Sequence, residues 1–148
     1  MPVGTPPVMS ERGVRQGDPC GALYFALTTQ DMLEEVSRAH PDAQPLAYAD
    51  DTTLQGTVPG ILAAFPDIQA RGEAIGLSFR LGKCGVYSPN AQLAGEVAYR
   101  LGIRHCADGL LAAGNPVGTD AFVTAHANAG AESICAGIDA LEDGLLSA

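Results

Sequence analysis

Residues 45–56 have the sequence PLAYADDTTLQG, in which two adjacent aspartates, Asp50 and Asp51, separate two short apolar runs. Residues that favour β-structure lie on both sides of this acidic pair, which predicts a β-hairpin with carboxylates at its tip. Neighbouring carboxylates raise each other's pKa values, and a bound divalent cation removes that conflict. An Asp-Asp pair is also ordinary turn chemistry on a solvated loop, so this stretch alone leaves both interpretations open.

Composition and charge bound the class of protein. The chain has 148 residues, enough for one domain with a modest core, and its net charge is −9. Its few Lys and Arg residues are scattered, which argues against this chain alone binding the phosphate backbone of a nucleic acid. The sequence contains no apolar run of about 18 residues or more, so we expect no transmembrane helix.

The cysteines indicate an intracellular protein. Neither a C-x-x-C pair nor zinc-finger spacing of the histidines occurs, and the N-terminal sequence MPVGTPPVMSER does not have the form of a signal peptide. We therefore expect reduced thiols and a nuclear or cytoplasmic location rather than secretion. The adjacent His105 and Cys106 could contribute to a metal site, but we expect this pair to be incidental.

Hydrophobic periodicity predicts an α+β fold in which antiparallel β-hairpins pack on two or three helices. Helical patterns cover residues 20–39, run from Pro59 to a C-terminal glycine cap at Gly76, and extend from residue 120 or 121 to the end. Alternating or short apolar runs predict strands at residues 77–80, 84–87, 97–103 and 110–113, with the first two forming a hairpin.

Three stretches, in this order, resemble the palm of reverse transcriptases, especially those of non-LTR retrotransposons and group II introns. Residues 10–18, with the core GVRQGDP, resemble motif B of that family, and the YADD of residues 48–51 resembles its motif C. Gly76-Leu77-Ser78-Phe79 with Lys83 resembles motif D, and residues 114–123, GNPVGTDAFV, resemble a G-x-P-x-G region beyond it. Two independent motifs in the correct order carry more weight than any one of them.

The resemblance implies an RNA-directed DNA polymerase that transfers nucleotides with two Mg²⁺ or Mn²⁺ ions. Asp50 matches the metal-binding aspartate of motif C, and Asp51 is its acidic, supporting neighbour. Lys83 matches the lysine that neutralises or protonates the departing pyrophosphate. The loop residues Arg15, Gln16 and Gly17 match the segment that packs on the template base and the incoming nucleotide.

The sequence departs from the family pattern in one important respect. Motif A supplies another metal-binding aspartate N-terminal to motif B, but no Asp or Glu occurs in residues 1–10. Two hard cations need several converging carboxylates, so we expect an incomplete metal site and an inactive isolated chain. The family's motif A strand also pairs with the motif C hairpin. Without that strand, we expect an exposed sheet edge that favours aggregation or self-association.

The resulting hypothesis divides the chain into three parts: an irregular segment at 1–9, a partial reverse transcriptase palm at 10–123, and a C-terminal helix at 124–148 that begins the thumb. It describes a truncated retroelement polymerase whose full-length relatives bind a template-primer and nucleotides, with no membrane association. Two alternatives stay open. One is a domesticated, non-enzymatic palm remnant that binds RNA or a protein partner, and the other is an unrelated α+β domain with accidental motif matches.

Overall fold

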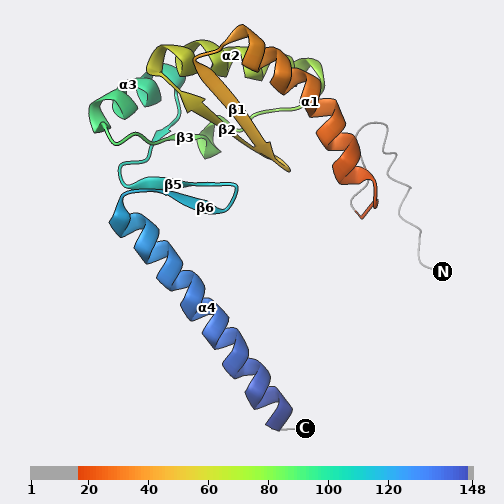
Figure 1. The fold of residues 1–148 in the computed structure, drawn as a ribbon, viewed down its shortest axis with the longest axis vertical. Helices are drawn as coiled ribbons and strands as arrows, with labels where there is room; N and C mark the ends of the chain where they lie inside the picture. Colours follow the sequence, from red (N-terminus) through yellow and green to blue (C-terminus); the bar gives the residue numbers. More distant parts are fainter. Residues whose placement is uncertain (1–16, 147–148) are drawn as a thin grey trace, which may run out of the picture.

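The computed structural model describes residues 17–146 of the chain, with side chains through residue 141. This part has a mixed α+β fold, as predicted, with three separate two-stranded sheets (Figure 1). Its elements are α1 (Gly21–Ala39), β1 (Ala43–Tyr48), β2 (Asp51–Gly56), α2 (Val58–Ala74), the 3-10 turn η1 (Leu81–Lys83), β3 (Gly85–Val86), α3 (Ala91–Leu101), β4 (Arg104–His105), β5 (Gly109–Ala112), β6 (Asn115–Gly118) and α4 (Asp120–Leu146).

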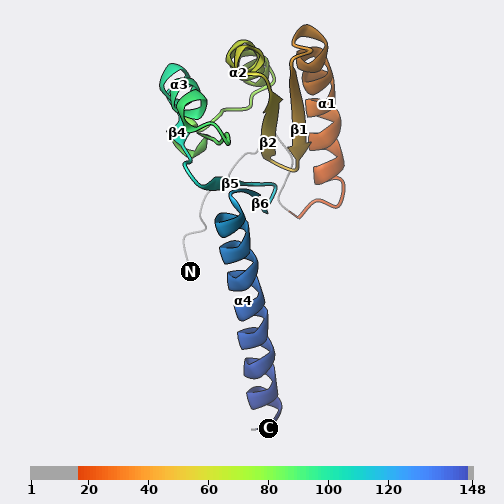
Figure 2. The same cartoon turned by 60° about the vertical axis from the view of Figure 1, so that its left-hand side comes forward.

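The predicted acidic hairpin is present as β1 and β2, which pair antiparallel from Ala43 opposite Gly56 to Tyr48 opposite Asp51. Both α1 and α2 contact this hairpin and each other, so the two helices cover one of its faces (Figures 1 and 2). The prediction that a hairpin packs on two helices is therefore confirmed for this part of the chain.

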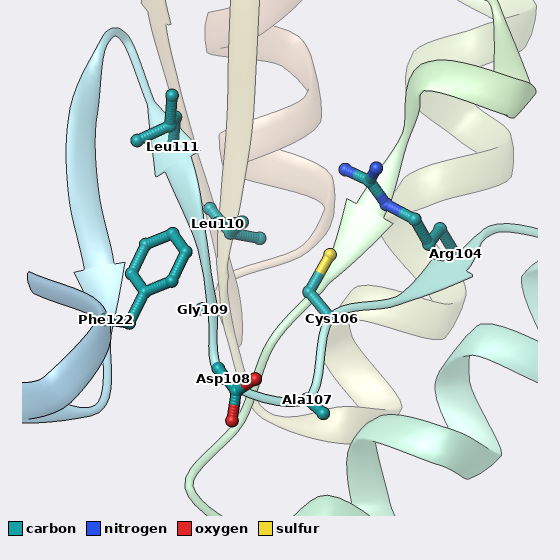
Figure 3. Close-up of a pocket in the computed structure, with 8 residues that line it drawn as sticks. All are labelled: Arg104, Cys106, Ala107, Asp108, Gly109, Leu110, Leu111 and Phe122. Carbon is teal, nitrogen blue, oxygen red and sulfur yellow. The ribbon is translucent and has the colours of Figure 1, made fainter. Parts of the chain in front are cut away.

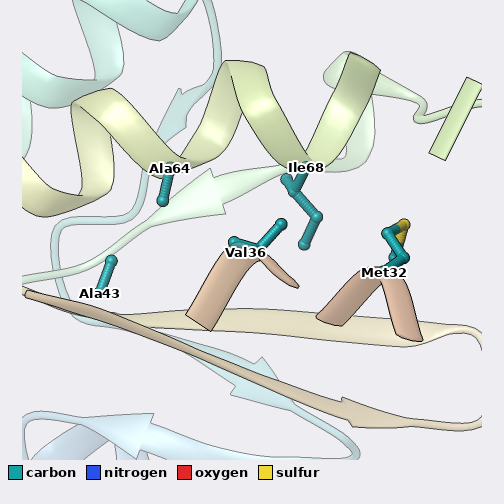
Figure 4. Packing of buried hydrophobic residues seen from close by; sticks show 5 residues of the cluster. All are labelled: Met32, Val36, Ala43, Ala64 and Ile68. Carbon is teal, nitrogen blue, oxygen red and sulfur yellow. The ribbon is translucent and has the colours of Figure 1, made fainter. Parts of the chain in front are cut away.

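The main core lies between the two helices and the hairpin, and it is built from small and medium side chains. Val36 of α1 and Ala64 of α2 are fully buried, and Ala43 of β1 lies beside them (Figure 4). Met32 and Ile68 complete the buried cluster, and further apolar side chains pack around it: Leu33, Leu54, Ile61 and Phe79. Because the buried side chains are small, the backbones of the three elements can approach closely.

Two glycines make the closest of these approaches. A Cβ atom on Gly56 would lie 2.1 Å from the carbonyl oxygen of Asp42, and one on Gly60 would lie 2.5 Å from the same atom. Thr57, between them, donates its backbone N–H to Asp42 at 3.0 Å. Glycine is therefore required where the start of α2 passes over the start of β1.

The ends of α1 and α2 follow signals that are visible in the sequence. Helix α1 ends at Ala39, because His40 precedes a proline and so avoids the helical conformation. The hydroxyl of Thr57 accepts the N–H of Gly60 at 3.2 Å and caps α2, which has a proline in its first turn. Gly76, with φ of 88°, closes α2 as predicted, and the N–H of Leu77 bonds back to Gly72 at 2.8 Å.

The predicted strand at residues 97–103 is wrong, because residues 91–101 form the helix α3. The alternation that suggested a strand puts Tyr99 on the same side as Val97, but Tyr99 is 87% exposed whereas Val97 is buried. The side chain of Asn90 accepts two backbone N–H groups and caps the helix, and Gly102 ends it in the left-handed conformation. The helix-capping residues Asn90 and Gly102 were therefore a better guide to the structure of this segment than its short alternating pattern.

The predicted hairpin at residues 77–80 and 84–87 is also wrong. Residues 77–80 are not a strand, and Leu81–Lys83 form a single 3-10 turn. The strand that follows, β3, pairs in parallel with β4 rather than antiparallel with its own neighbour. A Cβ on Gly85 would lie 2.8 Å from the sulfur of Cys106, so this pairing depends on a contact between residues far apart in sequence.

The C-terminal part consists of a second hairpin and a long helix. The expected strand at 110–113 is β5, which pairs antiparallel with β6 through a turn in which Ala113 and Gly114 both have positive φ. The predicted C-terminal helix is confirmed as α4, although the expected boundary between residues 123 and 124 falls inside it. Among the described residues, no helix is long and apolar enough to span a membrane.

An ion-pair network joins the end of α1 to α2. Asp67 lies 3.0 Å from the Nε2 atom of His40 and accepts the Nε–H of Arg71 at 2.9 Å. Arg71 also pairs with Glu35 of α1. Burial raises the pKa of Asp67, but the hydrogen bonds and positive charge of Arg71 and His40 outweigh it, so the net pKa is below the ordinary value.

We predict that Gly60→Ala destabilises the protein, because the added methyl group collides with the backbone of Asp42. The expected loss is about 1–3 kcal/mol in the free energy of unfolding, measured by urea titration. Gly95→Ala in α3 is the matched control, because its Cβ would have no neighbour within 4 Å. That variant should gain about 0.5–1 kcal/mol from helix propensity, and equal effects at the two sites would contradict the packing argument.

We predict that Asp67→Asn lowers the free energy of unfolding at pH 7 by about 1–2 kcal/mol, because it removes charge-assisted hydrogen bonds. The folded pKa of Asp67 is depressed, so its stabilising effect is present above the unfolded value of about 3.9 and is lost as the pH falls through the folded value. Melts from pH 7 down to pH 2 should therefore show the two proteins converging in acid.

Glu96→Gln is the matched control for the ion-pair network. Glu96 and Arg100 form an exposed pair at 3.7 Å within one helix, which should be worth less than about 0.5 kcal/mol. A stability difference between wild type and Asp67→Asn that does not change with pH would show that the carboxylate charge is not the stabilising element.

Candidate functional site

The tip of the β1–β2 hairpin presents both predicted aspartates to solvent. Ala49 and Asp50 form a two-residue turn, and Asp51 begins β2 opposite Tyr48. Ala49 has φ of 52°, which is uncommon for a residue with a Cβ and matches the first turn position of a type II′ hairpin. The sequence prediction of an acidic hairpin tip is therefore confirmed.

The alternation of the strands separates the two faces of this hairpin. Leu54 packs on the core beneath the helices, and its partner in register is Pro45. Residues of opposite parity lie on the other face, where Leu46 is 51% exposed and Tyr48 is 73% exposed. Asp51 is paired with Tyr48 and so shares this open face, away from α1 and α2.

The two aspartates supply the right kind of metal ligand but too few of them. Carboxylate oxygens suit Mg²⁺ and Mn²⁺, and both side chains are exposed and make no ion pair within residues 17–141. In the described part of the chain, no group of three or more His, Cys, Asp or Glu residues could hold a metal ion. The residues at the tip therefore fit part of a divalent-cation site, and no catalytic step can be derived from them alone.

The structure covers little of the predicted nucleotide-binding loop. Arg15 and Gln16 lie outside the described residues. Gly17 is exposed, has φ of 89°, and has no atom within 4 Å of an ideal Cβ. Its conformation is one that side chains rarely adopt, which explains a glycine at this position without assigning it a ligand. The side chain of Asp18 accepts the N–H of Cys20 at 2.8 Å, in the turn before α1.

Lys83 is the last residue of η1 and is exposed. Arg38, Arg71 and Arg100 are engaged in ion pairs with acidic side chains. Within residues 17–141, the cationic side chains outside such pairs are those of Arg80, Lys83 and Arg104. No ion pair in that part of the chain joins Lys83 to either tip aspartate.

A cleft that the sequence analysis did not identify lies between β4, β5 and the start of α4. Its volume is about 380 Å³. In Figure 3, the Phe122 ring and the Arg104 side chain stand on opposite sides, with Leu110 and Cys106 between them. Asp108 adds a carboxylate at the edge. The residues that line it all lie between Arg104 and Phe122, where the sequence patterns indicate strands and a helix but not a cleft.

The described thiols show no disulfide and no metal cluster. Cys106 is buried, Cys84 is partly buried, and Cys20 and Cys135 are exposed. Burial raises the pKa of the Cys84 thiol, which disfavours a reactive thiolate there. Within residues 17–141, His105 and Cys106 do not belong to any candidate metal group, and the reduced state of the thiols stays a prediction.

Comparison with known proteins adds no assignment. No protein-family model, curated protein or solved structure matches this chain. The functional argument therefore depends on the residues and their geometry.

Proposed function

We propose that this chain is part of the palm of an RNA-directed DNA polymerase of retroelement origin. The observation that carries the proposal is the Asp50-Asp51 pair at a two-residue hairpin turn, on a hairpin whose other face is packed by the helix before it and the helix after it. A nucleotidyl-transfer site needs carboxylates at an exposed, well-defined turn, where they can meet a cation and a phosphate. The ordered motifs in the sequence support the same assignment.

In this proposal each sequence motif has a physical task. Asp50 holds a divalent cation, Asp51 supports it, and the exposed Lys83 offers positive charge to the leaving pyrophosphate. The open hairpin face, with Leu46 and Tyr48, provides a surface on which a nucleic acid can lie. The two tip carboxylates make an incomplete ligand set, so the isolated chain is inactive and needs further carboxylates to form the two-metal site.

The unpaired outer edges of the β1–β2 sheet give the proposal a second consequence. Within the described residues, this sheet has two strands and neither pairs with any other strand. In this proposal, a strand that carries another acidic residue pairs with one of these outer edges, extends the sheet and supplies the missing metal ligand. Self-association through the same edge stays a prediction.

We predict weak, localised binding of Mn²⁺ at the hairpin tip. In amide NMR spectra of the full chain, millimolar Mn²⁺ should broaden residues 49–52 more than the exposed Glu34 and Glu35 of α1, because these two glutamates pair with arginines whereas the tip aspartates make no ion pair within residues 17–141. Asp50→Asn should remove the preferential broadening, and Asp31→Asn should leave it unchanged. Broadening spread evenly over all acidic residues would count against a metal site at the tip.

We predict no primer extension by the isolated chain with Mg²⁺ or Mn²⁺. Activity should appear when residues 10–123 replace the corresponding palm segment of an active non-LTR reverse transcriptase, because that host supplies the missing carboxylates. Asp50→Ala in the chimera should abolish extension, a loss of at least about 10³-fold. Asp31→Asn, on an exposed helix face, is the control. A folded chimera that binds template-primer but stays inactive would refute the proposal, and so would an Asp50→Ala chimera that retains activity.

A further inference from the structure

The cleft between β4, β5 and the start of α4 has one cationic wall. Arg104 of β4 and Cys106, which follows this strand, have side chains on the same side of the β3–β4 pair, over Gly85. An ideal Cβ on Gly85 would lie 2.8 Å from the sulfur of Cys106 and 3.7 Å from the Nε atom of Arg104. The backbone N–H groups of Arg104 and Cys106 donate to the carbonyls of Cys84 and Val86, at 3.1 and 2.9 Å respectively. Pairing with the β3 segment thus holds this wall in place.

The opposite wall of the cleft is apolar. Phe122, in the first turn of α4, stands across the cleft from Arg104 in Figure 3. The Cδ1 atom of its ring lies 2.5 Å from the position of a Cβ on Gly109 and 3.0 Å from that of a Cβ on Gly118, which is paired with Gly109 in the second hairpin. The ring therefore occupies space that two glycines leave open, and the hairpin positions it without a ligand. Leu110 adds an aliphatic side chain to the same cleft.

Charge indicates what the cleft can accept. Arg104 is the one Lys or Arg among the residues that line it, and it makes no ion pair within residues 17–141. Asp108 also lines the cleft, but it does not pair with this guanidinium. Guanidinium groups bind carboxylates, phosphates and similar oxyanions through charge-assisted hydrogen bonds. The cleft therefore matches a ligand with an acidic group at one end and an apolar body at the other.

The size of the cleft and the charge around it favour a small molecule over a strand of nucleic acid. Its volume of about 380 Å³ falls within the range of small-molecule sites, about 300–1,000 Å³. Asp120 begins the helix beside the cleft, and the sequence after Arg104 contains no Lys or Arg. A polyanion would therefore find no second cationic side chain on that side, whereas a molecule with a single acidic group needs only Arg104.

We propose that this cleft binds a small organic anion, with its acidic group at Arg104 and its apolar body against Phe122 and Leu110. Burial of the apolar body supplies affinity, and the guanidinium selects for the charge. The site uses none of the residues assigned to nucleotidyl transfer, which are the tip aspartates and Lys83. It therefore does not depend on the polymerase proposal.

The test uses the full chain and two dyes that fluoresce in apolar surroundings. Anilinonaphthalene sulfonate carries an acidic group, and phenylnaphthylamine has the same rings without it. In fluorescence titrations, the sulfonate should saturate one site per chain and bind at least about tenfold more tightly than the uncharged dye. The preference should shrink when the salt concentration rises from about 0.05 M to 0.5 M, because salt screens exposed charges.

Variants of the chain separate the role of Arg104 from that of general surface charge. Arg104→Gln should weaken binding of the sulfonate by at least about tenfold and leave binding of the uncharged dye nearly unchanged. Arg80→Gln is the matched control, because Arg80 is exposed, makes no ion pair within residues 17–141 and does not line the cleft. Asp108→Asn should strengthen binding of the sulfonate by about twofold, because it removes a like charge from the cleft.

The apolar wall is tested by Phe122→Leu, which should weaken binding of both dyes by at least about threefold. Circular dichroism must first show that this variant is folded, because the ring packs on Gly109 and Gly118. Arg104 is exposed, so Arg104→Gln tests the site even if the variant of the apolar wall does not fold. In amide NMR spectra, the shift changes caused by the sulfonate should be confined to residues 104–111 and 119–123.

Equal affinity for the two dyes would overturn the proposal. An equal loss of affinity in Arg104→Gln and Arg80→Gln would also overturn it, because general surface charge would then bind the sulfonate. So would displacement of the sulfonate by a short single-stranded oligonucleotide, because the cleft would then bind nucleic acid. None of these measurements involves the hairpin tip or primer extension, so a failure here is distinguishable from a failure of the polymerase proposal.

Discussion

The contact between the start of α2 and the start of β1 is the constraint on which the main body depends. Gly56 and Gly60 leave the space that the backbone of Asp42 occupies, and the N–H of Thr57 bonds to that same residue. Any side chain at the two glycines would push α2 away from the hairpin. The core that this approach closes is small, and among its fully buried side chains the largest is Val36. Close approach of the backbones thus fills interior space that large aliphatic side chains fill in bigger cores.

This junction also fixes the place of the candidate site. At the base of the hairpin Ala43 is buried against the helices, whereas Tyr48 and Asp51 at the other end are exposed. The acidic tip is thus anchored at a distance by a rigid base while its side chains stay in water. Adjacent carboxylates tolerate one another there because solvent screens their repulsion, which a dry core would not do.

The sequence predicted most of the local structure and little of the distant packing. The hairpin, α1, α2 and α4 have clear patterns and end signals, such as the Thr57 cap and Gly76. The strand predicted at 97–103 was wrong because alternation over a few residues also fits one side of a helix, and Asn90 and Gly102 were the better guides. The parallel pairing of β3 with β4 depends on Gly85 meeting Cys106, a contact that no local pattern encodes.

The candidate site likewise has a part that the sequence predicted and a part that it did not. The tip aspartates were predictable because turn chemistry and motif spacing are local properties of the sequence, and Arg15 and Gln16 fall outside the described residues. The cleft beside Arg104 and Phe122 was not predicted, since the patterns of residues 104–122 indicate strands and a helix but not how these elements lie around one another. Gly118 is needed there because an added Cβ would lie 2.3 Å from the carbonyl oxygen of Asp108.

Positive and negative charge are distributed unevenly along the chain. In the described part, the Lys and Arg side chains outside ion pairs are confined to Arg80, Lys83 and Arg104, while the sequence after Arg104 has acidic residues and no Lys or Arg. A polyanion is therefore attracted to the segment around residues 80–104 and repelled by α4.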